Sequence, residues 1–256
     1  LAGMLLIGEQ KKISRIIFLV CLVGFTGAIF VSSSRGALLA LAVTAAIGWI
    51  RNPKRILAGL IVALLLLAGV YLLPGANKAR LQSALHPESD STVNIRLNLW
   101  RAGLDMFTSH PILGVGPGNF PSVYYSQYPK LDASNVITAP HNIFIQASSE
   151  LGLMGTLPLL AMMFFLFRLN ARTRKMLRAT GEAGRQRLEY RLATALDLAL
   201  IAYVVSGSFL TVLYYPHLWG LLGMSVGVYS CCARMEATQS DPKPDFHQGH
   251  LTLAAQ

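Results

Sequence analysis

Three side chains stand out in a chain that carries few charges. Arg35 precedes an uncharged run, Arg96 lies in an amphipathic segment, and His141 immediately precedes a further apolar run. An arginine close to a membrane interior requires an aqueous cavity or an anionic partner, and a histidine titrates near neutral pH. These residue types allow anion binding by Arg35 and Arg96 and proton transfer by His141.

Each of the three has a structural alternative. Arg35 can snorkel from a helix end to the interface, Arg96 can contact a lipid headgroup, and His141 can face water where its helix begins. Arg101 has Asp105 as an i,i+4 partner, whereas Arg96 has no such partner in its segment. Arg96 is therefore the better candidate for binding an external anion, with Arg101 in a supporting role.

Two further residues are candidates for a supporting role. Glu150 lies two turns into the run after His141 and is predicted to face the interior of a bundle, where it orients the site or satisfies a buried donor. His217 lies in a short aromatic turn, and a structural role is favoured for it. Asn142 is predicted to cap the helix that follows it.

We expect no metal and no cofactor. The three cysteines lie in apolar runs and form no CxxC pair. Glu88-Ser89-Asp90 is the nearest approach to a DxD pair in the long polar connection. The segment 110–119 is rich in glycine, but no Lys-Ser/Thr follows, so it is not a nucleotide-binding P-loop.

The segment 94–107 is predicted to be an amphipathic helix. Trp100 and Phe107 are suited to the lipid interface. The apolar positions that recur at helical spacing are Ile95, Leu99, Ala102 and Met106.

The composition places these residues in a membrane protein. Hydrophobic residues make up 53% of the 256 residues and charged residues 13%, which excludes a soluble globular enzyme. Because uncharged runs recur along the chain, we expect an all-α, polytopic bundle of transmembrane helices in a single membrane domain. Residues 1–7 resemble the end of an earlier span, so we expect N-terminal spans to be missing. The six predicted spans are 16–34, 36–50, 56–74, 143–167, 192–213 and 218–233.

The basic residues predict the orientation. Most of the 22 Lys and Arg residues lie on alternate connections, and the positive-inside rule makes those connections cytoplasmic. The connection 168–191 is therefore predicted to be a cytoplasmic loop, and 74–141 a large periplasmic loop that contains the amphipathic helix. With this orientation, Arg35, Arg96 and His141 all lie on the periplasmic face. Topology thus explains the net charge of +10, and nucleic acid binding, which favours interleaved aromatic side chains, is not expected.

Taken together and in order, the motifs resemble the O-antigen ligase and O-antigen polymerase superfamily. The resemblance extends roughly from 16 to 228. The motifs that carry it are Ser33-Ser34-Arg35-Gly36, Arg96 with Trp100 and Phe107 leading into His110-Pro111-Ile112-Leu113-Gly114-Val115-Gly116, and Pro140-His141-Asn142 followed by Glu150-Leu151-Gly152 and Gly155.

The resemblance implies a multi-pass glycosyltransferase of the bacterial inner membrane whose active site faces the periplasm. The donor glycan is carried on undecaprenyl diphosphate, and the acceptor is lipid A-core or another glycan, all within membrane lipids. Arg35 and Arg96 match the arginines proposed to hold the diphosphate, and His141 matches the proposed base. Direct displacement at the anomeric carbon would invert it, and arginine charge would replace a metal.

Other activities remain open at this point. No arginine is followed by glycine in the Arg-x10-Gly pattern of some polymerases, and only one large outer loop is predicted, which favours a ligase. Exopolysaccharide polymerases and protein O-oligosaccharyltransferases share the same motifs. A small-solute or ion transporter would also carry intramembrane charges, but the sequence shows no inverted repeat and no pair of broken helices.

Overall fold

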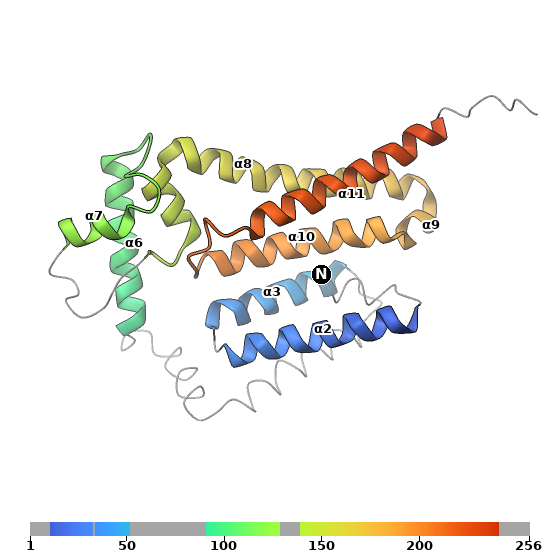
Figure 1. Cartoon of the computed structure of the whole chain (residues 1–256), viewed down its shortest axis with the longest axis horizontal. Helices are drawn as coiled ribbons and strands as arrows, with labels where there is room; N and C mark the ends of the chain where they lie inside the picture. Colours follow the sequence, from blue (N-terminus) through green and yellow to red (C-terminus); the bar gives the residue numbers. More distant parts are fainter. Residues whose placement is uncertain (1–10, 33, 52–90, 129–138, 241–256) are drawn as a thin grey trace, which may run out of the picture.

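The computed structural model describes residues 11–32, 34–51, 91–128 and 139–240, and within these ranges the chain forms helices joined by turns, with no strand (Figure 1). The predicted all-α class is confirmed, whereas the predicted span 56–74 lies outside the described residues. The helices are α2 (Lys12–Val31), α3 (Arg35–Arg51), α6 (Ser91–Ser109), α7 (Phe120–Gln127), α8 (Ile143–Ala179), α9 (Gly181–Gln186), α10 (Leu188–Gly207) and α11 (His217–Ser240).

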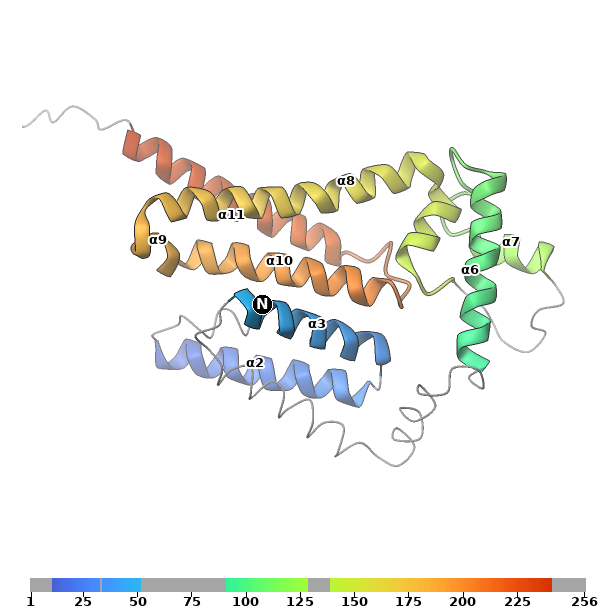
Figure 2. The ribbon, with the colours of Figure 1, turned by 180° about the vertical axis from the view of Figure 1, so that it is seen from behind.

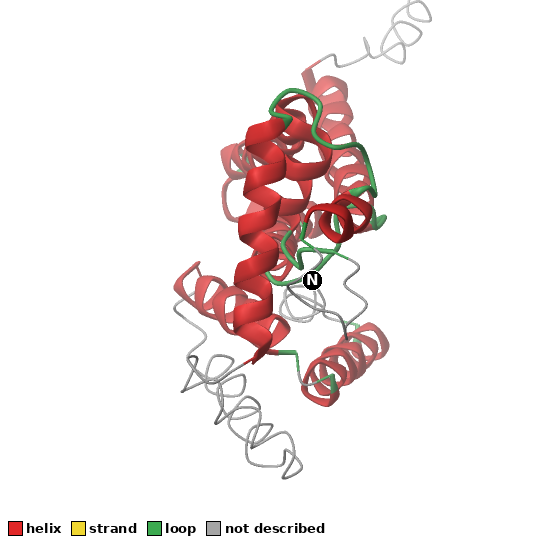
Figure 3. Cartoon of the chain, turned by 90° about the vertical axis from the view of Figure 1, so that its left-hand side faces the viewer, coloured by secondary structure: helices red, strands yellow, loops and turns green. Residues whose placement is uncertain are grey.

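Most of the long helices lie side by side, with α10 in contact with α3, α8 and α11 (Figures 1 and 2). Helix α6 instead lies across one end of this group, against the first part of α8. Figure 3 views the molecule from that end and shows α6 in front of the other helices. Helix α6 therefore crosses one end of the bundle, with α7 beside it.

Two of the described helices, α2 and α8, are long and apolar enough to cross a membrane, and α3 holds a shorter apolar segment, Gly36–Ile50. Apolar side chains on α2 and α8 are exposed, as expected for helices that face lipid: among them are Ile13, Val20, Phe25, Met154, Leu157, Phe164 and Phe165. The predicted arrangement of six spans stays a prediction.

The connection 168–191, predicted to be a cytoplasmic loop, is largely helical in the structure, and its side of the membrane stays a prediction. Helix α8 continues to Ala179, α9 follows, and α10 begins at Leu188. The predicted span 192–213 in turn ends early, since α10 stops at Gly207. Compared with the predicted spans, the helix hairpin formed by α8 and α10 is therefore longer at the end that carries α9. At its other end it is shorter.

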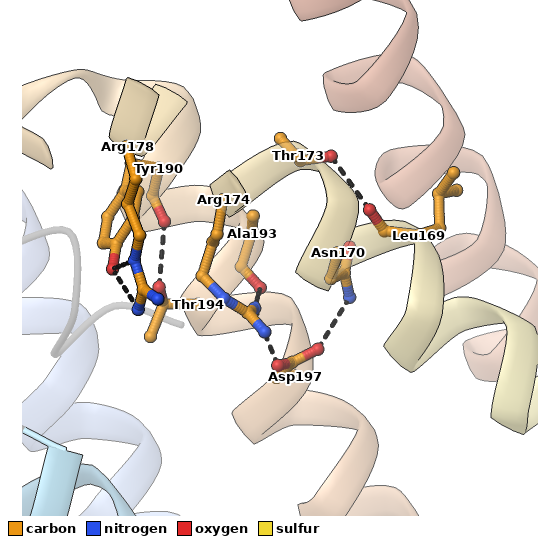
Figure 4. Close-up of polar contacts among 9 residues, drawn as sticks. All are labelled: Leu169, Asn170, Thr173, Arg174, Arg178, Tyr190, Ala193, Thr194 and Asp197. Carbon is orange, nitrogen blue, oxygen red and sulfur yellow. Dashed lines mark hydrogen bonds and ion pairs between the residues drawn. The ribbon is translucent and has the colours of Figure 1, made fainter. Parts of the chain in front are cut away.

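A buried ion pair joins the two helices of this hairpin (Figure 4). Arg174 of α8 lies 2.7 Å from the Asp197 carboxylate of α10 and donates to the Ala193 carbonyl, and the Asn170 amide donates to the same carboxylate at 3.1 Å. Asp197 is 1% exposed. Arg174, which lies in the predicted cytoplasmic connection, is thus a packing residue of the hairpin.

Helix α8 breaks at Gly152, where an uninterrupted span was predicted. The residue has φ 60° and ψ −159°, a conformation that is essentially restricted to glycine. Such a break leaves backbone groups on both sides without partners inside the helix. Their hydrogen bonds must come from another part of the chain, because unpaired backbone groups are costly in an apolar environment.

The segment 111–116 supplies these hydrogen bonds. The N–H groups of Val115 and Gly116 donate to the carbonyls of Ser149 and Glu150 at 2.8 and 2.9 Å. In return, the N–H groups of Leu153 and Met154 donate to the carbonyls of Pro111 and Ile112 at 2.8 and 3.0 Å. The glycine-rich segment is therefore a backbone plug for the broken helix.

Close backbone approach explains two of the glycines in this contact. Gly114 has φ 67°, and a Cβ atom on it would collide with the backbone of Glu150. A Cβ atom on Gly152 would collide with the carbonyl of Ile112. Glycine is needed at both positions because the backbone of one segment occupies the place where a side chain on the other segment would lie.

We expect Gly152→Ala to lower the free energy of unfolding by about 1–3 kcal/mol, since it combines backbone strain with a collision. Thermal unfolding in detergent measures the effect. The control is Gly220→Ala, because Gly220 lies in α11 with open space around its Cβ position, and there alanine should be neutral or stabilising. Equal unfolding temperatures for Gly152→Ala and wild type would contradict the plug.

Candidate functional site

The apolar face of α6 packs on protein. Leu99, Ala102 and Met106 are almost fully buried and cluster with Phe120 and Tyr124 of α7. The predicted amphipathic helix at 94–107 is thus confirmed within the longer α6. Its contacts hold α6 firmly against the end of the bundle.

Helix α6 also fixes the residues that precede α8. The Trp100 indole N–H donates to the carbonyl of Pro140 at 2.9 Å, so this tryptophan anchors the chain before α8. Its place at the lipid interface stays a prediction. The Asn142 side chain accepts from the N–H groups of Phe144 and Ile145 at 2.9 and 3.2 Å, which confirms the predicted N-cap. The residue between these two anchors is His141.

His141 adopts an unusual backbone conformation. Its φ of 50° makes it the one non-glycine residue with positive φ in the described part of the chain. Its ring is half-buried, and Nδ1 lies 3.3 Å from the hydroxyl of Thr211, in the connection between α10 and α11. Strain of this kind persists when neighbouring contacts impose it, and here Pro140 and Asn142 are both held.

Arg96 lies close enough to this histidine for its charge to act on the imidazole. It is one helical turn before Trp100, on the same side of α6. Burial lowers the pKa of His141 below its ordinary value, and the positive charge of Arg96 lowers it further. In the part of the chain that the structure describes, the Arg96 side chain has no hydrogen bond or ion pair, so its guanidinium can bind an anion next to a neutral imidazole.

The backbone of Arg35 begins α3 at the same end of the bundle. The next residue, Gly36, packs closely on Phe209: a Cβ atom added to Gly36 would lie 2.8 Å from the Cβ atom of Phe209. Phe209 is two residues before Thr211, the partner of His141. The structure therefore places the start of α3 near the His141 end of α10.

The buried Glu150 side chain connects three parts of the chain through hydrogen bonds. It is 1% exposed and accepts from the Tyr214 hydroxyl at 2.5 Å, the Gly118 N–H at 3.1 Å and the Gln146 amide at 3.4 Å. Burial raises the pKa of Tyr214, and the hydrogen bond to Glu150 and its charge raise it further. The carboxylate thus accepts hydrogen bonds from α8, from the loop after the plug segment and from the α10–α11 connection.

Arg101 and His217 are less closely associated with His141. The expected pair between Arg101 and Asp105 is not formed, because Asp105 accepts from the Tyr128 hydroxyl at 3.0 Å while Arg101 is exposed. His217 begins α11, is exposed, and lies edge-on to the Tyr215 ring at 5.9 Å. Within the described ranges neither makes a hydrogen bond to His141.

Sequence reasoning missed Thr211 and Tyr214. The aromatic turn that contains Tyr214 was noted for its histidine, and nothing near Thr211 marks it as a partner of a residue 70 positions earlier. For metals, the residues that the structure describes contain no group of three or more His, Cys, Asp or Glu placed to share an ion.

Comparison with known families adds one finding to this geometry. Residues 17–160, more than half of the chain, match the O-antigen ligase family, and the matched range includes Arg35, Arg96, His141 and Glu150. No curated protein matches the chain. The chain belongs to the O-antigen ligase family of membrane proteins.

Proposed function

We propose that this protein is a membrane glycosyltransferase of the O-antigen ligase type, which moves a glycan from undecaprenyl diphosphate to a hydroxyl of lipid A-core. Membership in the family supports an enzyme that acts on glycan and lipid substrates. The observation that carries the proposal is the hydrogen bond from Trp100 to Pro140, which brings Arg96, one turn earlier on α6, close enough to His141 for its charge to act on the imidazole. A guanidinium that can bind an anion and a neutral imidazole are the two groups that the reaction needs.

The guanidinium groups hold the donor. Arginine binds phosphate oxygens with paired hydrogen bonds and keeps its charge at any physiological pH. Arg96 is on α6, and the backbone of Arg35 begins α3 near the same end of the bundle. Two cationic residues on different elements suit a diphosphate with several anionic oxygens. Their charge also stabilises the leaving group as it departs, so the reaction requires no metal.

His141 acts as the base. The acceptor oxygen bonds to the anomeric carbon while the bond from that carbon to the diphosphate oxygen breaks, and the electron pair leaves with the lipid diphosphate. The proton of the acceptor hydroxyl passes to the imidazole and then to water. Attack opposite the leaving group inverts the anomeric carbon.

The break in α8 bears on the transporter alternative. Broken helices in transporters expose backbone groups that coordinate solutes. Here the carbonyls of Ser149 and Glu150 and the N–H groups of Leu153 and Met154 pair with the plug segment. This pairing favours the transferase. O-antigen or exopolysaccharide polymerases and protein O-oligosaccharyltransferases differ in the acceptor, and transfer assays with each acceptor separate them.

The proposed site faces the periplasm of the bacterial inner membrane. In a variant whose three cysteines are replaced by serine, we expect Ser109→Cys to react with a membrane-impermeant thiol reagent in intact cells. Ala179→Cys, at the opposite end of the α8–α10 hairpin, should react only after permeabilisation. Both residues are exposed, so access to solvent within the protein does not limit labelling. Labelling of Ala179→Cys in intact cells would reverse the orientation.

Substitution of Arg96 tests the donor site. We expect Arg96→Ala to lower transfer by about 10²–10³-fold, as for the loss of a group that stabilises developing charge. Arg96→Lys should restore part of the rate, since the paired geometry is lost. Arg101→Ala is the matched control on the same helix and should stay close to wild type. Equal losses at the two positions would contradict the assignment.

The pH dependence tests His141. The rate should rise with pH as the imidazole loses its proton, and because its pKa is lowered the rise should lie below about pH 6.5. Arg96→Gln removes a positive charge, so the rise should move to higher pH. His141→Ala should lower transfer by about 10²–10⁴-fold and leave donor binding in place. Near-normal turnover by His141→Gln would show that the histidine is not the base.

A further inference from the structure

We infer that Thr211 is a positioning residue that holds His141 in the tautomer whose Nε2 is free to accept a proton. The inference rests on the proposed function, in which His141 is the base. It concerns a residue outside the range that matches the family, 17–160. Thr211 therefore brings the second half of the chain into the site.

The geometry of the pair places Nδ1, rather than Nε2, at the Thr211 hydroxyl. The Thr211 hydroxyl lies 3.3 Å from Nδ1 of His141, and the structure shows no hydrogen bond at Nε2 among the described residues. A neutral imidazole carries one N–H, and a threonine hydroxyl can accept it. With Nδ1–H donating to Thr211, the lone pair of Nε2 is available to an acceptor hydroxyl.

Both partners are held in place. The backbone of His141 is set by Trp100 on one side and by the Asn142 cap on the other. On the opposite side, the connection between α10 and α11 is attached at two points directly after Thr211. The Tyr203 hydroxyl donates to the Val212 carbonyl at 3.1 Å.

The second attachment is the hydrogen bond from Tyr214 to Glu150, which links the connection to α8. Thr211 is therefore positioned by α10 through Tyr203 and by α8 through Glu150. Because two helices hold the Thr211 hydroxyl in place, it can fix the orientation of the His141 ring. A hydroxyl on an unattached connection would move together with the ring and could not fix it. This gives the buried carboxylate of Glu150 a role at the site without contact with substrate.

The experiment compares Thr211→Val, which removes the hydroxyl at nearly constant volume, with Thr211→Ser, which keeps it. Thr194→Val is the control, since the Thr194 hydroxyl donates to the Tyr190 carbonyl within α10. The ¹⁵N chemical shifts of ¹⁵N-histidine-labelled full chain in detergent at pH 8 report the tautomer. His141→Gln identifies the signals. Transfer rate and binding of a lipid-diphosphate-linked glycan are measured for the same variants.

We expect wild type and Thr211→Ser to show the Nδ1–H tautomer and Thr211→Val to show a mixture. Transfer by Thr211→Val should fall about 10–100-fold at unchanged donor binding, while Thr194→Val matches wild type. An Nε2–H tautomer in the wild type, or an unchanged tautomer in Thr211→Val, overturns the inference; the wild-type spectrum alone decides if Thr211→Val does not fold. A shifted tautomer with undiminished transfer leaves the positioning role standing and instead overturns His141 as the base.

Discussion

The break in α8 at Gly152 is the constraint on which the arrangement of the site depends. A broken helix must find partners for its freed backbone groups, and the segment 111–116 provides them through four hydrogen bonds. That segment directly follows α6, so pairing it with α8 brings α6 across the end of the bundle. Trp100 then reaches Pro140, and Arg96 comes close enough to His141 for its charge to act on the imidazole. The position of the cation thus follows from a requirement of the backbone.

Two arginines in the described chain illustrate opposite uses of charge. Arg174 is satisfied by Asp197 and the Ala193 carbonyl in a buried pair that joins α8 to α10. Arg96 has neither kind of partner in the described residues, and it lies next to an imidazole whose pKa it lowers. A partly buried cation is costly unless an anion binds it. This contrast is the physical basis for proposing that the donor diphosphate binds at Arg96.

The connection between α10 and α11 completes the site from the other side. It carries Thr211 to Nδ1 of His141 and Tyr214 to Glu150, and the same carboxylate accepts from Gly118 of the loop after the plug. Glu150 therefore couples the plug, the broken helix and this connection in one buried network. In such a network each hydrogen bond limits the movement of the others. The ring of His141, the proposed base, is therefore oriented by residues that are themselves held by other hydrogen bonds.

Local features could be predicted from the sequence because their partners are within one or two turns. The Asn142 cap bonds to the second and third residues after it, and the buried stripe of α6 follows from helical periodicity. The pair of Arg101 with Asp105 was also a local prediction and was wrong, because Tyr128, 23 residues away, takes the carboxylate. The break at Gly152, the anchor from Trp100 to Pro140 and the contact of Thr211 with His141 join positions that are distant in sequence. No period or spacing encodes such contacts, since they arise only when packed helices must satisfy each other's backbone and buried polar groups.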